Sequence, residues 1–337
     1  MSQPDIPTGN DLPQDPPQVS LSLYSHGLDL EQTLTSGQAF SWKQTANGRW
    51  RGWIDRKPCL VWSQGDALRA VGPGLTSELV SRYFGLDVSM PEVFSTFPND
   101  EWLDRARAFA PGLRILRQEP WEALCNFICS SLKQIVQIEQ INHKLRLTFG
   151  DPVGEGLHSF PEPMRLAQAT DAQLRECRLG FRARHLYVAA RQVASSEVSL
   201  DRIGSMTTPQ AREALRQIQG VGEKVANCIL LFAYGRKEAF PIDVWVERVL
   251  RQLYFNGSSR VSRERLRDFA DSHFGACRGY AQQFLFHWIR KDPKAPSLVK
   301  IESPKKKRMK RTPKAAEIMP PPQINQGRGA IHGLRDG

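Results

Sequence analysis

The chain has 337 residues, of which 40% are hydrophobic and eight are Trp, enough for two domains or one large domain with cores of ordinary size. Its longest apolar runs fall far short of the about 18 residues that a membrane-spanning helix needs. The first residues carry acids and prolines where a signal peptide has a basic region and an apolar core. These features argue against membrane insertion and export, and we expect an intracellular protein.

The formal net charge of +11 is concentrated near the C-terminal end. Residues 293–337 hold eleven Lys and Arg against three acids, a net +8, which leaves +3 for the rest of the chain. The basic run Lys305–Arg311 is typical of a disordered arm that either keeps the protein soluble or contacts phosphates without sequence preference. The six cysteines are expected to be reduced thiols, and they show no zinc or iron–sulfur ligand spacing.

The N-terminal part has the pattern of a small β-rich domain. Residues 1–18 are rich in Pro and Asp, and we expect them to be disordered. Phe40 and Trp42 then alternate with polar neighbours, and Asn47–Gly48 is a hairpin turn signal before a return strand through Trp50 and Ile54. Further short strands are predicted at Cys59–Trp62 and Leu68–Val71, and closing helices at Leu75–Phe84 and Glu101–Phe109. The predicted β-rich domain covers residues 19–115.

From Pro120 onward the hydrophobic period becomes helical. Trp121, Leu124, Cys125 and Ile128 form the stripe of a core-facing helix that starts at Glu119–Pro120. Thr170 and Gln173 make a capping box, and further stripes run over Val246–Leu253 and Phe284–Ile289. We therefore predict an all-helical domain over residues 116–292 and a disordered basic tail over 293–337, so the fold class is α+β.

The segment from Leu215 to Leu250 carries the most specific motif. Thr208–Pro209 opens a helix that is expected to end at Gln219, Gly220-Val221-Gly222 makes a tight turn, and a second helix begins at Glu223. Glycines allow a close backbone approach, and the free N–H groups at a helix N-terminus suit a phosphate. The pattern predicts a helix-hairpin-helix, found in many DNA-binding proteins; the alternative is a tight helical hairpin without a binding role.

Lys224 and Asp243 add chemistry to that hairpin. Lys224 lies in the first turn of the second helix, where the positive end of the helix dipole disfavours its ammonium form, and only a neutral amine is a nucleophile. Asp243 follows Pro241-Ile242 and precedes an apolar-periodic helix, the position of an N-cap worth about 1 kcal/mol. The same carboxylate is also placed to stabilise a cationic sugar as a base departs. The two roles are compatible.

The hairpin, Lys224 and Pro241-Ile242-Asp243 resemble the helix-hairpin-helix, glycine/proline-rich loop and aspartate motif of DNA glycosylases. Within that superfamily, Leu28 to Arg290 is similar to the 8-oxoguanine DNA glycosylase family, whose members are bifunctional glycosylases and abasic-site lyases. The resemblance implies a sheet domain packed on a helical domain. It also implies a monomer that acts on duplex DNA containing a damaged purine, in the nucleoid of a bacterium or the nucleus of a eukaryote.

The resemblance implies a role for each matching residue at the reacting centre. Lys224 matches the nucleophile and Asp243 the catalytic acid. Cys228 matches a cysteine that lines the base pocket, and Gln282 the glutamine that reads the Watson–Crick edge of the purine. Phe286 matches the aromatic residue that stacks on the base. From the residues alone, Cys228 and Phe286 are equally well core residues, and the glutamine assignment can slip from Gln282 to Gln283.

Other matching residues concern the lesion atom and the DNA. Gly37 matches the glycine whose carbonyl accepts a hydrogen bond from N7–H of oxidised guanine, although it also fits a simple turn. Phe181 stands where the family has a tyrosine wedge, and Arg182 matches the arginine that faces the orphaned cytosine. Gly220 and Gly222 are expected to contact DNA through the hairpin.

The sequence departs from the family where the opposite strand is read. Leu132, Lys133, Gln134 and Gln137 stand where well-known members have consecutive asparagines and an arginine. An arginine that contacts cytosine bidentately provides about 1–3 kcal/mol of discrimination. A strict preference for cytosine opposite the lesion therefore does not follow from the resemblance.

The expected reaction proceeds through a Schiff base on Lys224 and cleavage of the strand by β-elimination. No redox cofactor or catalytic metal is needed. The resemblance implies a structural cation held by main-chain oxygens of the hairpin, near Arg216, Ile218 and Val221. One alternative is a monofunctional alkylpurine glycosylase of the same fold, which Lys224 argues against. Another is a non-catalytic DNA-binding protein, which needs neither Lys224 nor Asp243.

Overall fold

The computed structural model describes residues 19–154 and 156–295, which belong to one compact unit, Met1–Ile301. The disorder expected for residues 1–18 and for the basic tail beyond residue 295 lies outside these described residues. Within them, no helix is long and apolar enough to cross a membrane.

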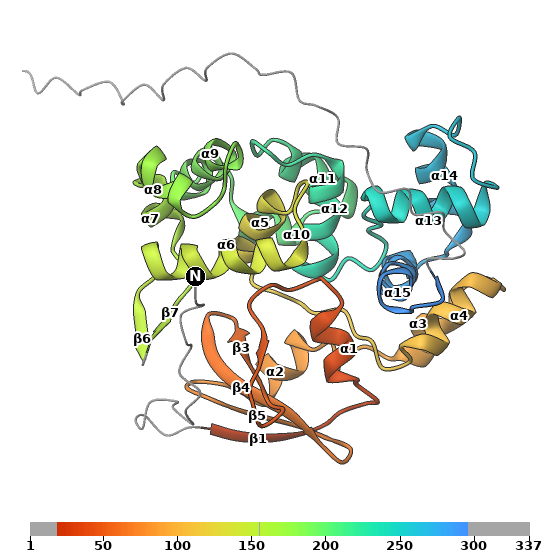
Figure 1. The fold of residues 1–337 in the computed structure, drawn as a ribbon, viewed down its shortest axis with the longest axis horizontal. Coiled ribbons are helices and arrows are strands. Elements are labelled where there is room, and N and C mark those ends of the chain that lie inside the picture. The colour runs from red at the N-terminus through yellow and green to blue at the C-terminus, as the bar shows by residue number, and fades with distance from the viewer. Residues whose placement is uncertain (1–18, 155, 296–337) are drawn as a thin grey trace, which may run out of the picture. The chain divides into compact units, whose positions relative to one another are not determined.

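An antiparallel sheet of five strands forms the N-terminal part (Figure 1). The strands stand in the order β1-β5-β4-β3-β2, and Trp50 pairs with Val61 across the middle of the sheet. The predicted turn at Asn47–Gly48 is confirmed, because Gly48 N–H donates to the Thr45 carbonyl at 3.0 Å and Thr45 N–H donates to the Arg49 carbonyl at 2.7 Å. The strands are β1 (Val19–Tyr24), β2 (Lys43–Gln44), β3 (Trp50–Ile54), β4 (Lys57–Gln64) and β5 (Ala67–Gly72).

Part of the predicted strand pattern is wrong. Leu30–Thr35 forms helix α1, whose N-cap Asp29 accepts the Gln32 N–H at 2.9 Å. Phe40 and Trp42 lie in an irregular segment before β2, and each is buried in a different core. Phe40 packs in the helical core, whereas Trp42 packs in the sheet core and donates to the Tyr83 hydroxyl at 2.8 Å. Two apolar residues separated by one polar residue therefore resemble an alternating strand, although the two side chains are buried in different cores.

Helix α2 (Ser77–Tyr83) follows the sheet and packs on β1 and β3. Helix α4 (Glu101–Phe109) has the predicted bounds, but it does not close the sheet domain. Its buried residues Leu103 and Ala106 join the helical core beside α15 (Figure 1). Helix α3 (Met90–Ser95) lies between α2 and α4 in the sequence and was not predicted.

The rest of the described chain is mainly helical. The helix start at Glu119–Pro120 and the capping box of Thr170 and Gln173 are confirmed. The prediction of an all-helical domain is wrong in one detail, a two-stranded hairpin of β6 (Pro152–Gly154) and β7 (Leu157–His158). The helices are α5 (Pro120–Cys129), α6 (Ile135–Phe149), α7 (Pro163–Ala167), α8 (Asp171–Glu176), α9 (Arg182–Ala194), α10 (Leu200–Ser205), α11 (Thr208–Arg216), α12 (Glu223–Phe232), α13 (Val244–Tyr254), α14 (Arg263–His273) and α15 (Arg278–Lys291).

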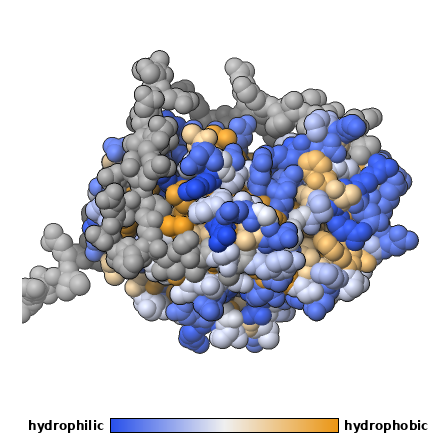
Figure 2. Space-filling view, turned by 90° about the horizontal axis from the view of Figure 1, so that it is seen from below, coloured by the Kyte–Doolittle hydropathy of each residue, from blue (hydrophilic) through white to orange (hydrophobic). Residues whose placement is uncertain are grey.

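A buried ion pair joins the helical part to the sheet. Arg146 of α6 bonds Glu122 of α5 at 2.6 Å and donates to Asn142 Oδ1 at 3.0 Å. Its guanidinium also lies 4.2 Å from the ring centre of Trp53 in β3. Removing either partner would leave an unpaired buried charge at a cost of about 3–5 kcal/mol, so the contact of α6 with the sheet depends on both residues. The face shown in Figure 2 is mostly hydrophilic, with small separate hydrophobic patches.

Candidate active site

The first helix of the hairpin, α11, ends at Arg216, three residues before the predicted Gln219. The N–H of Ile218 donates to Leu215 and that of Val221 donates to Ile218, so the chain continues in tight three-residue turns after the helix. Helix α12 begins at Glu223 as predicted, with Gly222 as its N-cap. The turn therefore places Lys224, the second residue of α12, in the first turn of that helix.

Lys224 lies half-buried between α12 and the end of α5. Its ammonium donates to Ser130 Oγ at 3.2 Å and lies 5.6 Å from the ring centre of Phe127. That ring is itself stacked on Phe232, with 5.6 Å between ring centres. The amine is thus held by one hydroxyl and one aromatic face rather than by a carboxylate.

Asp243 is the N-cap of α13, as the sequence predicts. One carboxylate oxygen accepts the N–H groups of Trp245 and Val246 at 2.9 and 2.8 Å. The buried thiol of Cys228 connects this carboxylate to Lys224. Burial raises the pKa of Cys228, Lys224 lowers it by its charge and by a hydrogen bond, and the Asp243 charge raises it. Lys224 and Asp243 therefore both lie within electrostatic reach of the Cys228 thiol.

Gly37, Phe286 and Arg290 form a wall of close contacts between the segment after α1 and helix α15. Gly37 has φ +86°, in the region that favours glycine. A Cβ there would lie 2.7 Å from Ile135 Cδ1, 2.9 Å from Arg290 Nη1 and 3.4 Å from Phe286 Cε1. The Arg290 guanidinium lies 4.7 Å from the Phe286 ring centre and donates to the Ser36 carbonyl at 3.1 Å. A side chain at position 37 would therefore displace the groups that form this wall.

The two adjacent glutamines of α15 have different surroundings. Gln283 is buried and its amide donates to the Ser36 carbonyl at 3.4 Å. Gln282 is 4% exposed, and its side-chain oxygen has no hydrogen-bond partner in the part of the chain that the structure describes. This oxygen can therefore accept a hydrogen bond without losing one from the described residues.

Arg290 of α15 and Asp243 at the start of α13 interact electrostatically. Burial lowers the pKa of the Arg290 guanidinium and the charge of Asp243 opposes that shift, so the cap of α13 lies within electrostatic reach of α15. Asp243 therefore lies within electrostatic reach both of Cys228 in α12 and of Arg290 in α15, which contacts Phe286.

The residues predicted to contact DNA lie around the hairpin and the start of α9. Phe181 is 60% exposed and meets the His185 ring edge-on, with 6.3 Å between ring centres. Gly220 has φ +89°, and a Cβ there would lie 2.7 Å from His185 Cβ. Gly222 differs, because a Cβ there would meet nothing within 4 Å. Arg182, next to Phe181, is buried.

Three residues of the site were missed by the sequence analysis. Ser130 and Phe127 hold the Lys224 amine, and Arg290 stacks on Phe286. Arg290 follows Gln282 by eight residues and Phe286 by four, which places all three on one face of the helix. Helix periodicity could therefore have identified Arg290 from the sequence. Ser130 and Phe127 are ordinary helix-end and core residues in the sequence, and only packing reveals their role.

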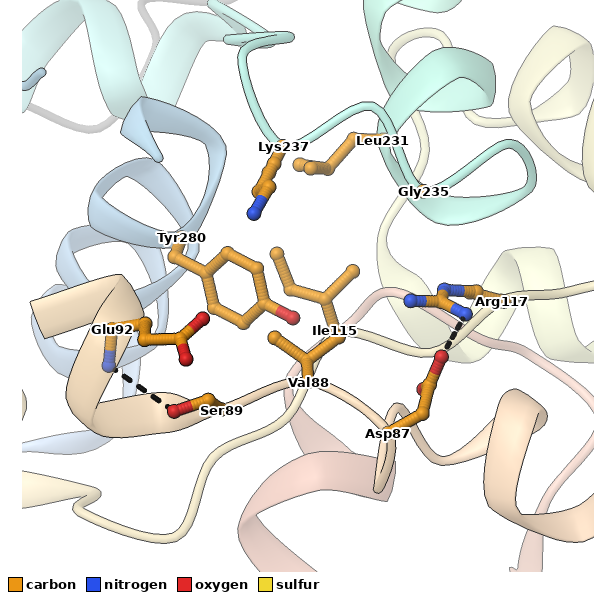
Figure 3. Close-up of a pocket in the computed structure, with 10 residues that line it drawn as sticks. All are labelled: Asp87, Val88, Ser89, Glu92, Ile115, Arg117, Leu231, Gly235, Lys237 and Tyr280. Carbon is orange, nitrogen blue, oxygen red and sulfur yellow. Dashed lines mark hydrogen bonds and ion pairs between the residues drawn. The ribbon is translucent and has the colours of Figure 1, made fainter. Parts of the chain in front are cut away.

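A pocket of about 230 Å³ lies apart from these residues, between the α2–α3 segment, the loop after α12 and α15 (Figure 3). The charges on its lining balance, with Asp87 paired to Arg117 at 2.7 Å and Glu92 facing Lys237. A balanced lining does not favour a polyanion, and no predicted site residue lines the pocket. Among the described residues, no group of three or more His, Cys, Asp or Glu is placed to hold a metal ion.

Comparison with known proteins covers both parts of the fold. Residues 20–124 match the family described as 8-oxoguanine DNA glycosylase, N-terminal domain, and residues 125–271 match the HhH-GPD superfamily base excision DNA repair proteins.

The chain is 34% identical over 205 residues to the N-glycosylase/DNA lyase of Saccharomyces cerevisiae, a match that spans 55% of this chain and 54% of the yeast protein. It is 30% identical over 302 residues to the probable N-glycosylase/DNA lyase of Methanothermobacter thermautotrophicus, spanning 78% of this chain and 94% of that protein. A solved structure of the Clostridium acetobutylicum 8-oxoguanine glycosylase/lyase, in complex with double-stranded DNA containing cytosine opposite 8-oxoguanine, superposes with a TM-score of 0.72. Its identity to this chain is 31%, over 78% of this chain and 92% of that one.

Proposed function

Because this chain belongs to the 8-oxoguanine DNA glycosylase family of HhH-GPD base excision repair proteins, we propose that it releases 8-oxoguanine from duplex DNA and then cleaves the strand at the abasic site. The observation that carries the proposal is the placement of Lys224 and Asp243 around the buried Cys228 thiol, together with the close approach of Gly37 to Phe286 and Arg290. Base release and strand cleavage need a nucleophilic amine and a carboxylate, and recognition of the base needs an aromatic ring on which it can stack.

The reaction starts with a base that leaves the stack, because C1′ of a paired nucleotide cannot be reached inside the duplex. The neutral amine of Lys224 forms a bond to C1′ as the N-glycosidic bond breaks, and the electron pair of that bond leaves with the purine. Asp243 stabilises the positive charge that develops on the sugar. Loss of a proton from the amine and opening of the sugar ring give a Schiff base.

The lyase step follows from the same intermediate. Removal of a proton from C2′ allows the C3′–O bond to break, and the 3′ phosphate leaves with the electron pair of that bond. The iminium of Lys224 accepts the electrons released at C2′, which makes the elimination possible. Ser130, which accepts a hydrogen bond from Lys224 in the free protein, orients the amine before attack.

The proposed base pocket consists of Gln282, Phe286 and Gly37. The side-chain oxygen of Gln282 accepts from the Watson–Crick edge of the purine, and this requirement favours Gln282 over Gln283, whose amide already bonds Ser36. Phe286 stacks on the base, and the carbonyl of Gly37 accepts the N7–H that distinguishes 8-oxoguanine from guanine. The crowding around Gly37 supports this role, because any side chain there would push Ile135 and Arg290 out of place.

The hairpin holds the DNA backbone. Among the described residues, no atom lies within 4 Å of the place that a Gly222 Cβ would take, and this space beside the N-terminus of α12 suits a phosphate. The resemblance also implies a structural cation at the turn. The carbonyls of Arg216, Ile218 and Val221 are hard oxygen donors that suit such an ion. When bound, the ion fixes the turn that presents these N–H groups.

Borohydride trapping tests the proposal. Wild-type protein is incubated with a duplex containing one 8-oxoguanine, reduced, and compared with Lys224→Gln and with the matched control Lys237→Gln, a lysine that faces the distant pocket. We expect a covalent adduct for wild type and for Lys237→Gln, and none for Lys224→Gln. Base release without any adduct would make the protein a monofunctional glycosylase. Absence of both base release and adduct would refute the substrate assignment.

A further inference from the structure

Arg290, near the end of α15, contacts two parts of the proposed base pocket at once. Its guanidinium carbon lies 4.7 Å from the ring centre of Phe286, one helical turn earlier, and its Nη1 donates to the Ser36 carbonyl at 3.1 Å. The first contact joins neighbours on one helix face, whereas the second joins residues 254 positions apart. Arg290 therefore connects the helix that carries the aromatic ring to the segment that carries Gly37.

The residues on either side of Gly37 are held by different parts of the chain. Gln38, which follows it, is fully buried, and its side-chain N–H donates to the Arg114 carbonyl at 2.8 Å. Ser36, which precedes it, is also fully buried, and its carbonyl is the one that accepts from Arg290. The segment before α5 therefore fixes one side of Gly37, and α15 fixes the other.

Two side chains of α15 donate to the Ser36 carbonyl, and Arg290 is the stronger donor. Its N–O distance is 3.1 Å, whereas that of Gln283 is 3.4 Å, beyond the about 2.7–3.2 Å that is usual for N–H···O bonds. A charged donor also forms a stronger hydrogen bond than a neutral amide. The link between α15 and the segment around Gly37 therefore depends mainly on Arg290.

Gly37 makes room for this link. A Cβ at position 37 would lie 2.9 Å from Arg290 Nη1 and 3.4 Å from Phe286 Cε1. Because glycine has no Cβ, the guanidinium can lie directly beside the peptide and still cover the ring. The glycine and the arginine therefore fit one another, and together they set how the Gly37 carbonyl and the Phe286 ring lie relative to each other.

The shape of the guanidinium suits this position. It is planar, so its face can cover an aromatic ring while its edge donates hydrogen bonds, whereas a lysine ammonium is a compact charge without such a face. Because Arg290 occupies one face of Phe286, a base can stack only on the other face.

We propose that Arg290 is a positioning residue of the base pocket, which holds the Gly37 carbonyl and the Phe286 ring in the relative arrangement that the oxidised purine meets. The inference rests on the proposed function. Arg290 acts through Ser36 and Phe286, so it does not itself need to contact the base. Its loss should therefore weaken recognition of the base and leave the chemistry of Lys224 intact.

The first test separates recognition from chemistry with two substrates. Single-turnover release of 8-oxoguanine is compared with cleavage of a duplex that already contains an abasic site, which has no base to recognise. Arg290→Met keeps a long side chain over Phe286 but loses the cation and the hydrogen bond to Ser36. We expect release to fall by at least about fivefold, and abasic-site cleavage to stay within about threefold of wild type.

Two further variants act as controls. Arg49→Met removes a guanidinium that is likewise half-buried and lies 4.2 Å from the ring centre of Trp62 in β4, and it should change both reactions by less than about threefold. Arg290→Lys keeps the charge that interacts with Asp243 but not the planar group, so release should stay at least about threefold below wild type. A melting temperature for each variant shows whether it is folded.

The second test measures recognition without chemistry. In the Lys224→Gln background, fluorescence anisotropy gives the affinity for a duplex with 8-oxoguanine relative to the same duplex with guanine. Adding Arg290→Met should lower this ratio by at least about threefold, with the affinity for the guanine duplex within about twofold. A side chain that only stabilises the fold would weaken both affinities alike.

Four outcomes would overturn the positioning role. They are a loss of release by Arg290→Met below about fivefold, release by Arg290→Lys less than about threefold below wild type, equal losses on the 8-oxoguanine and abasic substrates, and an affinity ratio that changes by less than about threefold. Each of these leaves the proposed function intact, because wild type still releases the base. A wild-type protein that releases no 8-oxoguanine would instead refute the proposed function, and the role of Arg290 with it.

Discussion

Replacing Gly37 by alanine tests the base pocket most directly. The positive φ of +86° costs alanine about 1–2 kcal/mol. A domain of this size loses about 2–4 °C of melting temperature per kcal/mol, so we expect a decrease of about 2–8 °C. The new methyl group would lie 2.7 Å from Ile135 Cδ1 and 2.9 Å from Arg290 Nη1, so these groups and Phe286 must move. Displacements near 1 Å at a reacting centre cost about 100-fold in rate.

The assay compares two substrates for Gly37→Ala. Release of 8-oxoguanine should fall by about 100-fold, whereas cleavage of an abasic site, which needs Lys224 but no base pocket, should stay near wild type. Gly48→Ala is the matched control, because Gly48 has φ +77° and a Cβ there would meet nothing within 4 Å. It should lower the melting temperature similarly and leave both reactions unchanged. Wild-type release by Gly37→Ala, or an equal loss on both substrates, would refute the placement of the base against Gly37.

Three further variants follow from the structure. Asp243→Asn keeps a good N-cap, so its unfolding free energy in urea should change by under about 0.5 kcal/mol while single-turnover release falls at least about 100-fold; unchanged release would leave Asp243 with capping alone. Gly222→Ala replaces an N-cap glycine by a poorer cap, so the melting temperature should fall by only about 1–4 °C. Duplex binding should weaken about two- to fivefold by fluorescence anisotropy, and unchanged affinity would remove the hairpin from the DNA contact. Burial lowers the pKa of His287 from 6.5 to about 4. The neutral imidazole therefore contributes stability that is fully present above pH 6.5 and is lost as the pH falls towards 4. The total loss is about 3 kcal/mol. Urea unfolding across that range should show a steeper loss for wild type than for His287→Gln, and equal slopes would contradict the assignment.

The parts of the fold that were predicted correctly depend on short-range contacts. The Asn47–Gly48 turn, the Pro120 helix start and the capping box at Thr170 each involve residues within four positions of one another. Helix α1 was not predicted because the region was interpreted as β-rich, although its N-cap Asp29 and Gln32 are a local helix signal. The apparent alternation of Phe40 and Trp42 arises from burial in two cores, which no local window can distinguish from one sheet face.

In the candidate site too, the residues with a local sequence signal were predicted and those defined by long-range contacts were not. Lys224 and Asp243 could be singled out because both positions are defined relative to a helix start, and a helix start has a local signature. Ser130 could not, because its contact with Lys224 joins residues 94 positions apart. For Arg182, the resemblance suggested a base contact, whereas packing buries the guanidinium against the Ser131 carbonyl.

Residue order alone was enough to predict the α+β class, the helix-hairpin-helix and the two residues proposed for the chemistry, since turns, caps and helix periodicity are local properties of the chain. Packing sets which side chains are left without partners. Gln282 has a free acceptor, Leu132 projects outward and Arg182 is enclosed because distant segments do or do not supply hydrogen bonds and apolar cover at those points. Long-range contacts of this kind depend on how the chain closes on itself, and no short stretch of sequence records them.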